Sequence, residues 1–281
     1  MLRIAVPNKG SLSDAAGDML REAGYRTRRD PKELVVTDGV NNVELFYLRP
    51  RDIAVYVGGS TVDCGITGRD LLLDAASPAV EVMPLGFGGS TFRYAARPGV
   101  VDAIPEIAGH RVATSYPGLV EKHLADMGIS AEVVRLDGAV ETAISLGVAD
   151  VIADVVETGA TLRSQGLAVF GEPILRSEAV LIKDANSQEQ SSVEVLRRRL
   201  LGVVTARSYV MLDYDCPREI IDAACEVTPG LESPTISPLA DRDWVAVRAM
   251  VPRLETNGIM DRLYELGARA ILVTEISACR I

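Results

Sequence analysis

The sequence is poor in aromatic residues: one Trp, eight Tyr and four Phe make up 5% of its 281 residues. Hydrophobic residues nevertheless account for 48% of the chain. The core must therefore be built mainly from Val, Ala, Leu and Ile, which is typical of α/β layers. A chain of this length has room for about two domains, since domains mostly span ~100–200 residues.

Cysteine and histidine are also scarce, with four and two residues respectively. None of the cysteines forms a CxxC pair, and no Cys/His group has the spacing of a zinc site. We expect all four cysteines to be reduced thiols in buried or half-buried positions, namely Cys64, Cys216, Cys225 and Cys279. His110 and His123 fit no helical HxxxH pattern and are expected at the surface.

Positive charge is in deficit, because the formal net charge is −10. Nucleic acids and anionic membrane surfaces both require a basic face, so neither is an expected partner. A phosphorylated ligand would have to be attracted by local Arg and Lys side chains. Apolar runs also stay well short of the ~18 residues of a membrane span. The segment Met1–Val6 lacks the basic start and apolar core of a signal peptide. These features predict a soluble, cytoplasmic protein.

The stretch 141–162, ETAISLGVADVIADVVETGATL, is the most informative part of the chain. Apolar residues at helical spacing predict a helix over 140–147. A strand follows over Val151–Val156 with Asp154 set into it, then the small polar loop Glu157–Thr161, then a helix from Leu162. A strand, Gly/Thr loop and helix can hold phosphate through backbone N–H groups and hydroxyls. An ordinary strand–turn–helix explains the same pattern equally well.

A similar pattern opens the chain, where the strand Leu2–Val6 is followed by the loop Pro7–Ser11 and a helix over Leu12–Ala23. The loop contributes Lys9, which suits a phosphate or polyphosphate ligand. The alternative is a solvated loop lysine. We favour the functional interpretation, because open α/β sheets bind ligands beyond the carboxyl ends of their strands.

The middle of the chain predicts two lobes joined by a hinge. Gly88–Thr91 is a Gly-Gly-Ser link between strands, and glycine absorbs large backbone changes. A second α/β unit follows this link, and its loop residue Tyr116 could stack on a base or be a plain turn tyrosine. The pattern predicts an α/β core with the two-lobed architecture of periplasmic binding proteins.

The tail differs in kind, because its elements follow the order βαββαβ of a ferredoxin-like module. It carries no catalytic constellation of its own, which favours a regulatory or assembly role. The predicted division is one lobe over 1–90 plus 182–210, a second lobe over 91–181, and a regulatory domain over 211–281.

Specific residues carry a family resemblance through the whole chain. In the central stretch they are Glu141, Gly147, Ala149, Ile152, Asp154, Val155, Thr158, Gly159, Thr161 and Leu162. The further matching segments are Val6–Leu12, Leu48–Pro50, Gly65–Asp70, Phe92–Tyr94, Leu212–Tyr214 and Gly230–Thr235. Together they resemble the ATP phosphoribosyltransferase family. The tail makes the chain similar to the long form, which carries its own regulatory domain and needs no separate regulatory subunit.

The resemblance implies a pentosyltransferase, a glycosyltransferase that converts ATP and phosphoribosyl pyrophosphate to N1-(5-phosphoribosyl)-ATP and pyrophosphate with Mg²⁺. This reaction is the first step of histidine biosynthesis. It implies that the loop cradles the ribose 5-phosphate through Glu157, Thr158, Gly159, Ala160 and Thr161. Catalytic roles would fall to Lys9, Arg49 and Asp154. The remaining cleft residues would be Asp70, Ser90 and Tyr116. Magnesium would be held mainly by pyrophosphate oxygens, with Asp154 a possible protein ligand.

The resemblance further implies feedback inhibition by histidine through the tail. Asp215 is the candidate for the amino group of histidine, with Thr235 and Ala270 nearby. The family also suggests homodimers that assemble into hexamers.

Two rival functions remain at this stage. A solute-binding protein shares the two-lobed architecture, although the phosphate loop counts against it. A phosphoribosyltransferase for another base is the second rival. The usual type of that enzyme has two adjacent acids after a hydrophobic run, which this sequence lacks.

Overall fold

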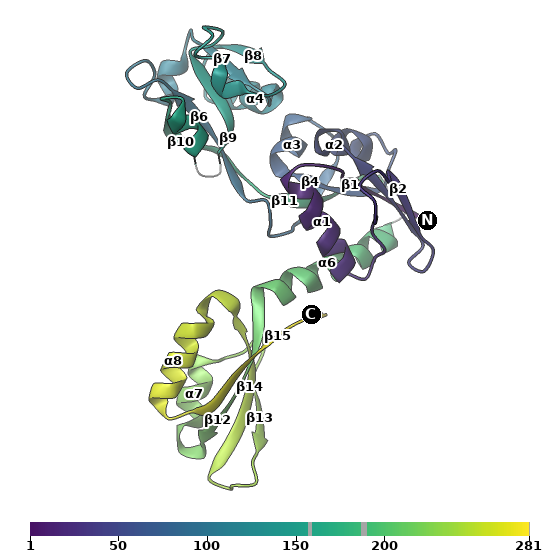
Figure 1. The fold of residues 1–281 in the computed structure, drawn as a ribbon, viewed down its shortest axis with the longest axis vertical. Helices are drawn as coiled ribbons and strands as arrows, with labels where there is room; N and C mark the ends of the chain where they lie inside the picture. Colours follow the sequence, from purple (N-terminus) through teal and green to yellow (C-terminus); the bar gives the residue numbers. More distant parts are fainter. Residues whose placement is uncertain (157–158, 187–189, 281) are drawn as a thin grey trace. The chain divides into compact units, whose positions relative to one another are not determined.

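The protein is described by a computed structural model that covers residues 1–156, 159–186 and 190–280 (Figure 1). The chain forms two compact units, Met1–Arg197 and Arg198–Ile281, and each is described by itself. Unit 1 contains two β-sheets, and unit 2 contains a third.

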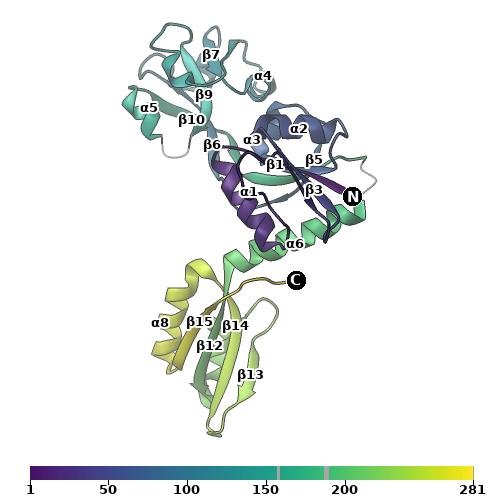
Figure 2. The same cartoon turned by 45° about the vertical axis from the view of Figure 1, so that its right-hand side comes forward.

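The first sheet of unit 1 has the strand order β2-β3-β1-β4-β11-β5. Its strands are β1 (Leu2–Pro7), β2 (Val35–Asp38), β3 (Val43–Leu48), β4 (Cys64–Gly68), β5 (Val80–Pro84) and β11 (Ala179–Lys183). Its helices are α1 (Ser11–Glu22), α2 (Pro50–Gly58) and α3 (Arg69–Asp74), visible around this sheet in Figure 2. The central strands β1 and β4 are buried on both faces, as strands covered by helices must be.

Parallel pairing in this sheet brings two loops to one edge. Strand β1 runs parallel to β3 with Pro7 opposite Leu48, and parallel to β4. The loops after β1 and β3 therefore leave the sheet side by side. Strand β2 pairs with β3 in the antiparallel direction.

The second sheet of unit 1 has the order β10-β6-β9-β7-β8. Its strands are β6 (Ser90–Ala96), β7 (Arg111–Thr114), β8 (Glu132–Arg135), β9 (Val151–Val156) and β10 (Ala168–Ser177). Its helices are α4 (Pro117–Asp126) and the short α5 (Ala160–Ser164). The buried aromatic side chains of Phe92, Tyr94 and Phe170 lie in the core of this sheet, together with aliphatic residues. With the first sheet, this arrangement confirms the two-lobed α/β architecture.

Chain segments connect the two sheets twice: once between β5 and β6, and once where β10 is followed by β11. The expected free link Gly88–Thr91 is only half correct. Gly88 has a positive φ of 65°, but Ser90 and Thr91 already belong to β6, where they pair with Ser177 and Arg176. Strand β6 begins earlier than expected because β10 continues past a bulge and pairs with Ser90 and Thr91. The sequence pattern of one segment does not reveal such a partner.

The helix predicted over 140–147 is wrong. Only Val140–Thr142 forms a 3-10 turn, and bends and turns follow it. Ala139 and Gly147 both adopt positive φ, at 49° and 69°, so the backbone leaves the helical region at both ends of the stretch. The apolar residues Ala143 and Ile144 are still buried, and this burial is the source of the helical periodicity.

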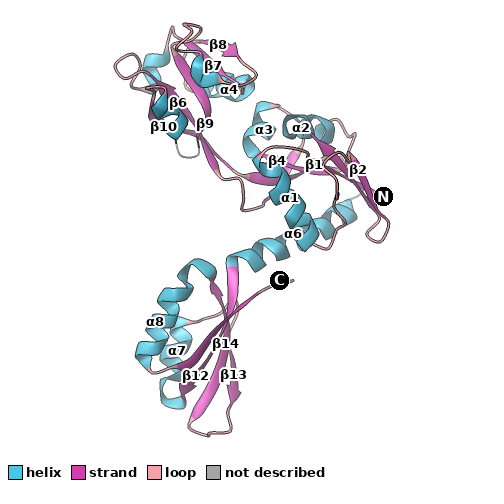
Figure 3. Cartoon of the chain, in the orientation of Figure 1, coloured by secondary structure: helices cyan, strands magenta, loops and turns pink. Residues whose placement is uncertain are grey.

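Unit 2 forms a four-stranded antiparallel sheet with the order β13-β14-β12-β15 (Figure 3). Its elements are β12 (Tyr209–Pro217), α7 (Ile221–Val227), β13 (Thr235–Pro238), β14 (Trp244–Pro252), α8 (Thr256–Leu266) and β15 (Arg269–Glu275). Alternate residues of β12 and β14 are buried with α7 and α8 in one core. This order confirms the predicted ferredoxin-like module. Helix α6 (Gln190–Ser208) contains the boundary between the units.

Two smaller expectations can be compared with the structure. The four cysteines are free thiols, with Cys64 and Cys216 buried and Cys225 and Cys279 partly buried, as predicted. The histidines are only partly exposed, and the His123 ring shares a 3.1 Å hydrogen bond with the Tyr94 hydroxyl. Within the described residues, no helix is both long and apolar enough to cross a membrane.

Candidate active site

A pocket of about 310 Å³ opens where β9 ends. Its lining residues are Glu141, Asp154, Val155, Val156, Gly159, Ala160, Thr161 and Leu162. The structure therefore brings together Asp154 and the described part of the predicted phosphate loop. The predicted residues Glu157 and Thr158 lie outside the described residues. The helix that follows the loop, α5, is short and ends at Ser164.

Gly159 shapes the entry to this short helix. Its φ of 69° is left-handed, a conformation that glycine adopts without steric cost. A Cβ at this position would also meet the Arg163 Nη1 atom at 3.2 Å. The loop therefore turns tightly beside the pocket and leaves Ala160 and Thr161 exposed at its rim.

Asp154 is a carboxylate held in an unfavourable environment. Burial is the main cause that raises its pKa, and the negative charges of Glu141 and Asp70 raise it further. The backbone N–H of Val155 donates a 2.8 Å hydrogen bond to Asp154 Oδ1, and this bond together with the charge of Arg51 lowers the pKa in part. Perturbed carboxylates in a pocket favour a functional role.

Tyr116 contributes an aromatic surface in the same region. It lies at the start of α4, packs edge-on against Phe92 with ring centroids 5.1 Å apart, and has the guanidinium of Arg51 4.8 Å above its ring. Burial, followed by the charge of Asp70, raises the pKa of the Tyr116 hydroxyl. The electrostatic effects link Tyr116, Asp70 and Asp154, so three predicted site residues share one neighbourhood.

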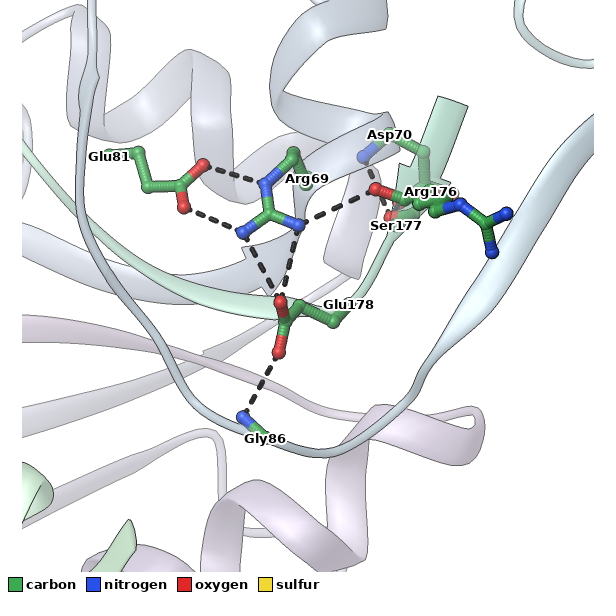
Figure 4. Close-up of polar contacts among 7 residues, drawn as sticks. All are labelled: Arg69, Asp70, Glu81, Gly86, Arg176, Ser177 and Glu178. Carbon is green, nitrogen blue, oxygen red and sulfur yellow. Dashed lines mark hydrogen bonds and ion pairs between the residues drawn. The ribbon is translucent and has the colours of Figure 1, made fainter. Parts of the chain in front are cut away.

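Asp70 lies in the first turn of α3 and is 7% exposed. Its backbone N–H donates to Ser177 Oγ at 3.0 Å, and Ser177 Oγ donates to Asp70 Oδ1 at 2.8 Å. Next to it, Arg69 donates to both oxygens of Glu81 and to Glu178, whose Oε2 accepts a hydrogen bond from the Gly86 backbone (Figure 4). Asp70 is therefore fixed to the end of β10.

The predicted cations Lys9 and Arg49 follow the adjacent ends of β1 and β3, and both side chains are exposed. Their common edge follows from the parallel pairing of the two strands. Ser90 begins β6 opposite Ser177 and lines a second pocket of about 500 Å³ together with Thr91, Val156 and Arg176.

Sequence reasoning missed four residues that the structure places beside the predicted ones: Arg51, Asp74, Glu141 and Ser177. Arg51 lies two residues after the predicted Arg49, and Glu141 is part of the matched stretch. For Asp74 and Ser177 there was no signal, because their partners lie 23 to 107 positions away in the sequence.

In unit 2, the open face of the sheet forms a pocket of about 620 Å³. The three residues predicted for the effector, Asp215, Thr235 and Ala270, all line it. Asp213 and Arg248, paired at 2.6 Å, add one charge of each sign. Ala270 has a φ of 50°, in the left-handed region that a residue with a Cβ rarely adopts.

The fold defines a class of two-lobed α/β proteins with a Gly/Thr-lined pocket at a strand end and an attached ferredoxin-like domain. Two family models match the chain: "ATP phosphoribosyltransferase" over residues 49–202, and "HisG, C-terminal domain" over residues 206–278. The chain belongs to the ATP phosphoribosyltransferase family of pentosyltransferases, in its long form.

Similar proteins support this assignment along the entire chain. An ATP phosphoribosyltransferase of Arthrobacter sp. (strain FB24) is 62% identical, and one of Salinispora tropica is 61% identical, each with 100% of both chains covered. Among solved structures, a chain of the ATP phosphoribosyl transferase (HisG:HisZ) complex of Thermotoga maritima matches with a TM-score of 0.64 and 25% identity. The match covers 73% of this chain and 98% of that one.

Proposed function

We propose that this chain transfers the phosphoribosyl group of phosphoribosyl pyrophosphate to N1 of ATP and releases pyrophosphate, as the first step of histidine biosynthesis. The observation that carries the proposal is the pocket in which Asp154 lies beside Gly159, Ala160 and Thr161. Its Gly/Thr rim provides backbone N–H groups and a hydroxyl for the 5-phosphate. The family match along the chain supports the two substrates.

The chemistry requires positioning rather than a strong base. Adenine N1 carries a lone pair and attacks C1 of the ribose as the bond to pyrophosphate breaks. Positive charge develops on the ribose and negative charge on the leaving group. Catalysis therefore means holding two substrates in line and stabilising the departing pyrophosphate. Lys9 and Arg49, at the common edge of β1 and β3, provide cations for this purpose. Asp154 provides a carboxylate for the ribose hydroxyls or for the developing positive charge.

Magnesium fits the donors present. The carboxylates of Glu141 and Asp154 line one pocket, and carboxylate oxygens are the ligands that Mg²⁺ prefers. In the part of the chain that the structure describes, no group of three or more His, Cys, Asp or Glu side chains could hold a metal ion by itself. We propose that Glu141 and Asp154 are the carboxylates that would hold Mg²⁺ together with substrate oxygens, and that the ion would neutralise charge on the diphosphate.

The nucleotide is proposed to lie against Tyr116 with Asp70 nearby. An aromatic ring and a carboxylate suit a nucleoside, because the ring stacks on the base and the carboxylate accepts from amino or hydroxyl groups. A carboxylate would repel a phosphate at the same place. Ser90 would line the cleft between the nucleotide and the diphosphate.

The pocket of unit 2 is proposed to bind histidine as an inhibitor, with Asp215 receiving the amino group and Thr235 and Ala270 lining the site. We propose that the enzyme is cytoplasmic, assembles from dimers into hexamers, and is regulated by its own C-terminal domain without a separate regulatory subunit. The match of residues 206–278 to the family's C-terminal domain supports this regulatory role. Sedimentation measurements with and without histidine would test the assembly.

The decisive experiment mixes the protein with ATP, phosphoribosyl pyrophosphate and Mg²⁺ and measures pyrophosphate release. Release that requires all three components is the expected result. Binding of a substrate without release would favour the solute-binding alternative. Equal release with GTP or another purine in place of ATP would favour a phosphoribosyltransferase for another base.

A further inference from the structure

We propose that Ser177 is a positioning residue for ATP: its hydroxyl holds the carboxylate of Asp70 in the orientation that meets the nucleotide. This inference rests on the proposed function, because it takes Asp70 as a residue of the nucleotide site. Ser177 belongs to β10 and lies 107 positions from Asp70 in the sequence.

The two residues form a reciprocal pair of hydrogen bonds. Ser177 Oγ accepts from the Asp70 backbone N–H at 3.0 Å and donates to Asp70 Oδ1 at 2.8 Å. Both residues are buried, with 7% of Asp70 and 6% of Ser177 exposed. A single hydroxyl therefore binds both the main chain and the side chain of Asp70. With Oδ1 engaged, the carboxylate is held in one rotamer and its second oxygen points in a fixed direction.

Gly68 provides the space that this rotamer needs. A Cβ at Gly68 would lie only 2.2 Å from Asp70 Oδ1, far inside van der Waals contact. The backbone of Gly68 has an ordinary φ of −78°, so conformational freedom does not explain the glycine. The close approach of the Asp70 carboxylate does explain it. Two elements of the structure, β4 and β10, thus act on the same carboxylate.

The position of Ser177 is itself fixed by its neighbours in the chain. The Arg69 guanidinium donates to Glu178 and, at 3.5 Å, to the carbonyl of Arg176 (Figure 4). The Arg69 backbone N–H also donates to the Glu178 carbonyl at 3.0 Å. Arg69 is also held by both oxygens of Glu81. The first turn of α3 is therefore bound to both residues that flank Ser177, and the hydroxyl has little freedom to move away.

The surroundings of Asp70 indicate which substrate this pair controls. The negative charge of Asp70 acts on the hydroxyl of Tyr116, whose ring packs against Phe92 and Arg51. The phosphate loop, by contrast, is represented in the pocket at the end of β9 by Gly159 to Thr161. Asp70 does not line that pocket and acts on its residue Asp154 through charge rather than through a hydrogen bond. Ser177 should therefore affect ATP and leave phosphoribosyl pyrophosphate largely unaffected.

The test compares Ser177→Ala with Ser77→Ala by steady-state kinetics on the full-length enzyme. Ser77 is the control, because it is a partly buried serine whose hydroxyl, like that of Ser177, is hydrogen-bonded. Its partner is the Ala54 carbonyl at 2.6 Å, not Asp70. We expect Ser177→Ala to lower kcat/KM for ATP by about tenfold, the equivalent of one hydrogen bond to a charged group. The KM for phosphoribosyl pyrophosphate should change by less than about twofold. Ser77→Ala should leave both constants near those of the wild type.

Two further variants separate positioning from folding. Ser177→Cys keeps the side-chain volume with a weaker donor and acceptor, and should lower kcat/KM for ATP in the same direction. Gly68→Ala should also lower kcat/KM for ATP, because its new methyl group displaces the Asp70 carboxylate. In an Asp70→Ala background, Ser177→Ala should have no additional effect on ATP.

An unchanged kcat/KM for ATP in Ser177→Ala would overturn the inference, as would equal losses for both substrates or a full additional loss in the Asp70→Ala background. Absence of pyrophosphate release by the wild-type enzyme is a different outcome, because it would refute the proposed function itself. Thermal unfolding of each variant shows whether the fold is retained. If Ser177→Ala does not fold, the result for Ser177→Cys decides the inference.

Discussion

Arg51 and Asp74 form an ion pair in which Arg51 Nη1 donates to Asp74 Oδ2 at 2.7 Å, while the other carboxylate oxygen of Asp74 accepts the Leu119 backbone N–H at 3.2 Å. The Asp74 side chain is 8% exposed, whereas that of Arg51 is 41% exposed and lies over the Tyr116 ring. The carboxylate of Asp74 thus holds both Arg51, which lies above the Tyr116 ring, and the beginning of α4, which carries that ring. This relationship, with the site around it, leads to four predictions.

Replacing Asp74 with alanine should destabilise the fold. The substitution leaves the Leu119 N–H without its acceptor and Arg51 without its partner, so we expect a loss of about 1–3 kcal/mol in the free energy of unfolding. Arg51 is largely solvated and contributes little to this figure. Urea denaturation measures the effect. Asp126→Ala removes the exposed partner of Lys122 and should cost at most about 0.5 kcal/mol. Equal losses in the two variants would contradict the role of Asp74.

Thr161→Ala should weaken binding of phosphoribosyl pyrophosphate about tenfold or more, because it removes a hydroxyl donor to the 5-phosphate. Titration calorimetry with phosphoribosyl pyrophosphate and with histidine measures both affinities, and that for histidine should not change. Thr142→Ala is the control, since its hydroxyl is exposed and bonds only locally, to the Ala139 carbonyl. Similar losses for both ligands would mean that the loop has been misassigned.

Asp154→Asn should raise stability at neutral pH and lower activity. The pKa of Asp154 is raised in the folded protein, so the folded state binds this proton more tightly than the unfolded state does. As pH rises from the ordinary pKa of an aspartate through the folded pKa, the native state loses stability through this group, and above the folded pKa the penalty is complete.

Asparagine carries no charge and retains an oxygen to accept from Val155, so it removes the penalty. Thermal unfolding from about pH 8 down to about pH 4, which reaches the ordinary pKa range of an aspartate, should show the variant more stable at the upper end. The difference should shrink towards acid as Asp154 becomes protonated. A stability advantage that does not depend on pH would argue against a strained charge. Pyrophosphate release should fall in the same variant, as expected where a strained site serves function.

Asp215→Asn should weaken histidine inhibition about tenfold or more while the uninhibited rate stays unchanged, because it removes the charge proposed to receive the amino group. The histidine concentration that halves the rate is the quantity to measure. Asp222→Asn, an exposed acid on α7 outside the pocket, provides the control. An unchanged response to histidine would move the effector away from the face that carries Asp215, Thr235 and Ala270.

The parts of the molecule predicted well are those whose patterns are local. Val151–Val156 was predicted as a strand and forms β9 with the same bounds, since its β-branched run leaves little alternative. The order of elements in unit 2 was also predicted, because alternating burial along β12 and β14 is visible as a period of two. The domain boundaries at 90/91, 181/182 and 210/211 remain predictions.

The errors occurred where tertiary contacts overrode a local pattern. The stretch 140–147 has helical periodicity but forms a 3-10 turn, because its apolar side chains are buried by the sheet while Ala139 and Gly147 turn the backbone. The link before Phe92 proved shorter than expected, because Ser90 and Thr91 find partners on β10. Neither the burial of the first stretch nor the strand pairing of the second can be inferred from the segment itself.

The sequence by itself determined the α/β class, the ferredoxin-like tail and the family, because periodicity, turn residues and a long signature are all properties of contiguous segments. It also named Asp154, Gly159, Ala160 and Thr161 in one pocket and Asp215, Thr235 and Ala270 in the other. Only the tertiary structure decided which residues interact. It showed that Ser177 holds Asp70 across 107 positions, that Asp74 rather than a neighbour in sequence holds Arg51, and that Asp154 is partly buried in the pocket that Glu141 also lines. The physical reason is that hydrogen bonds, desolvation and charge interactions depend on distances in space, and sheet pairing sets those distances between segments far apart in the chain.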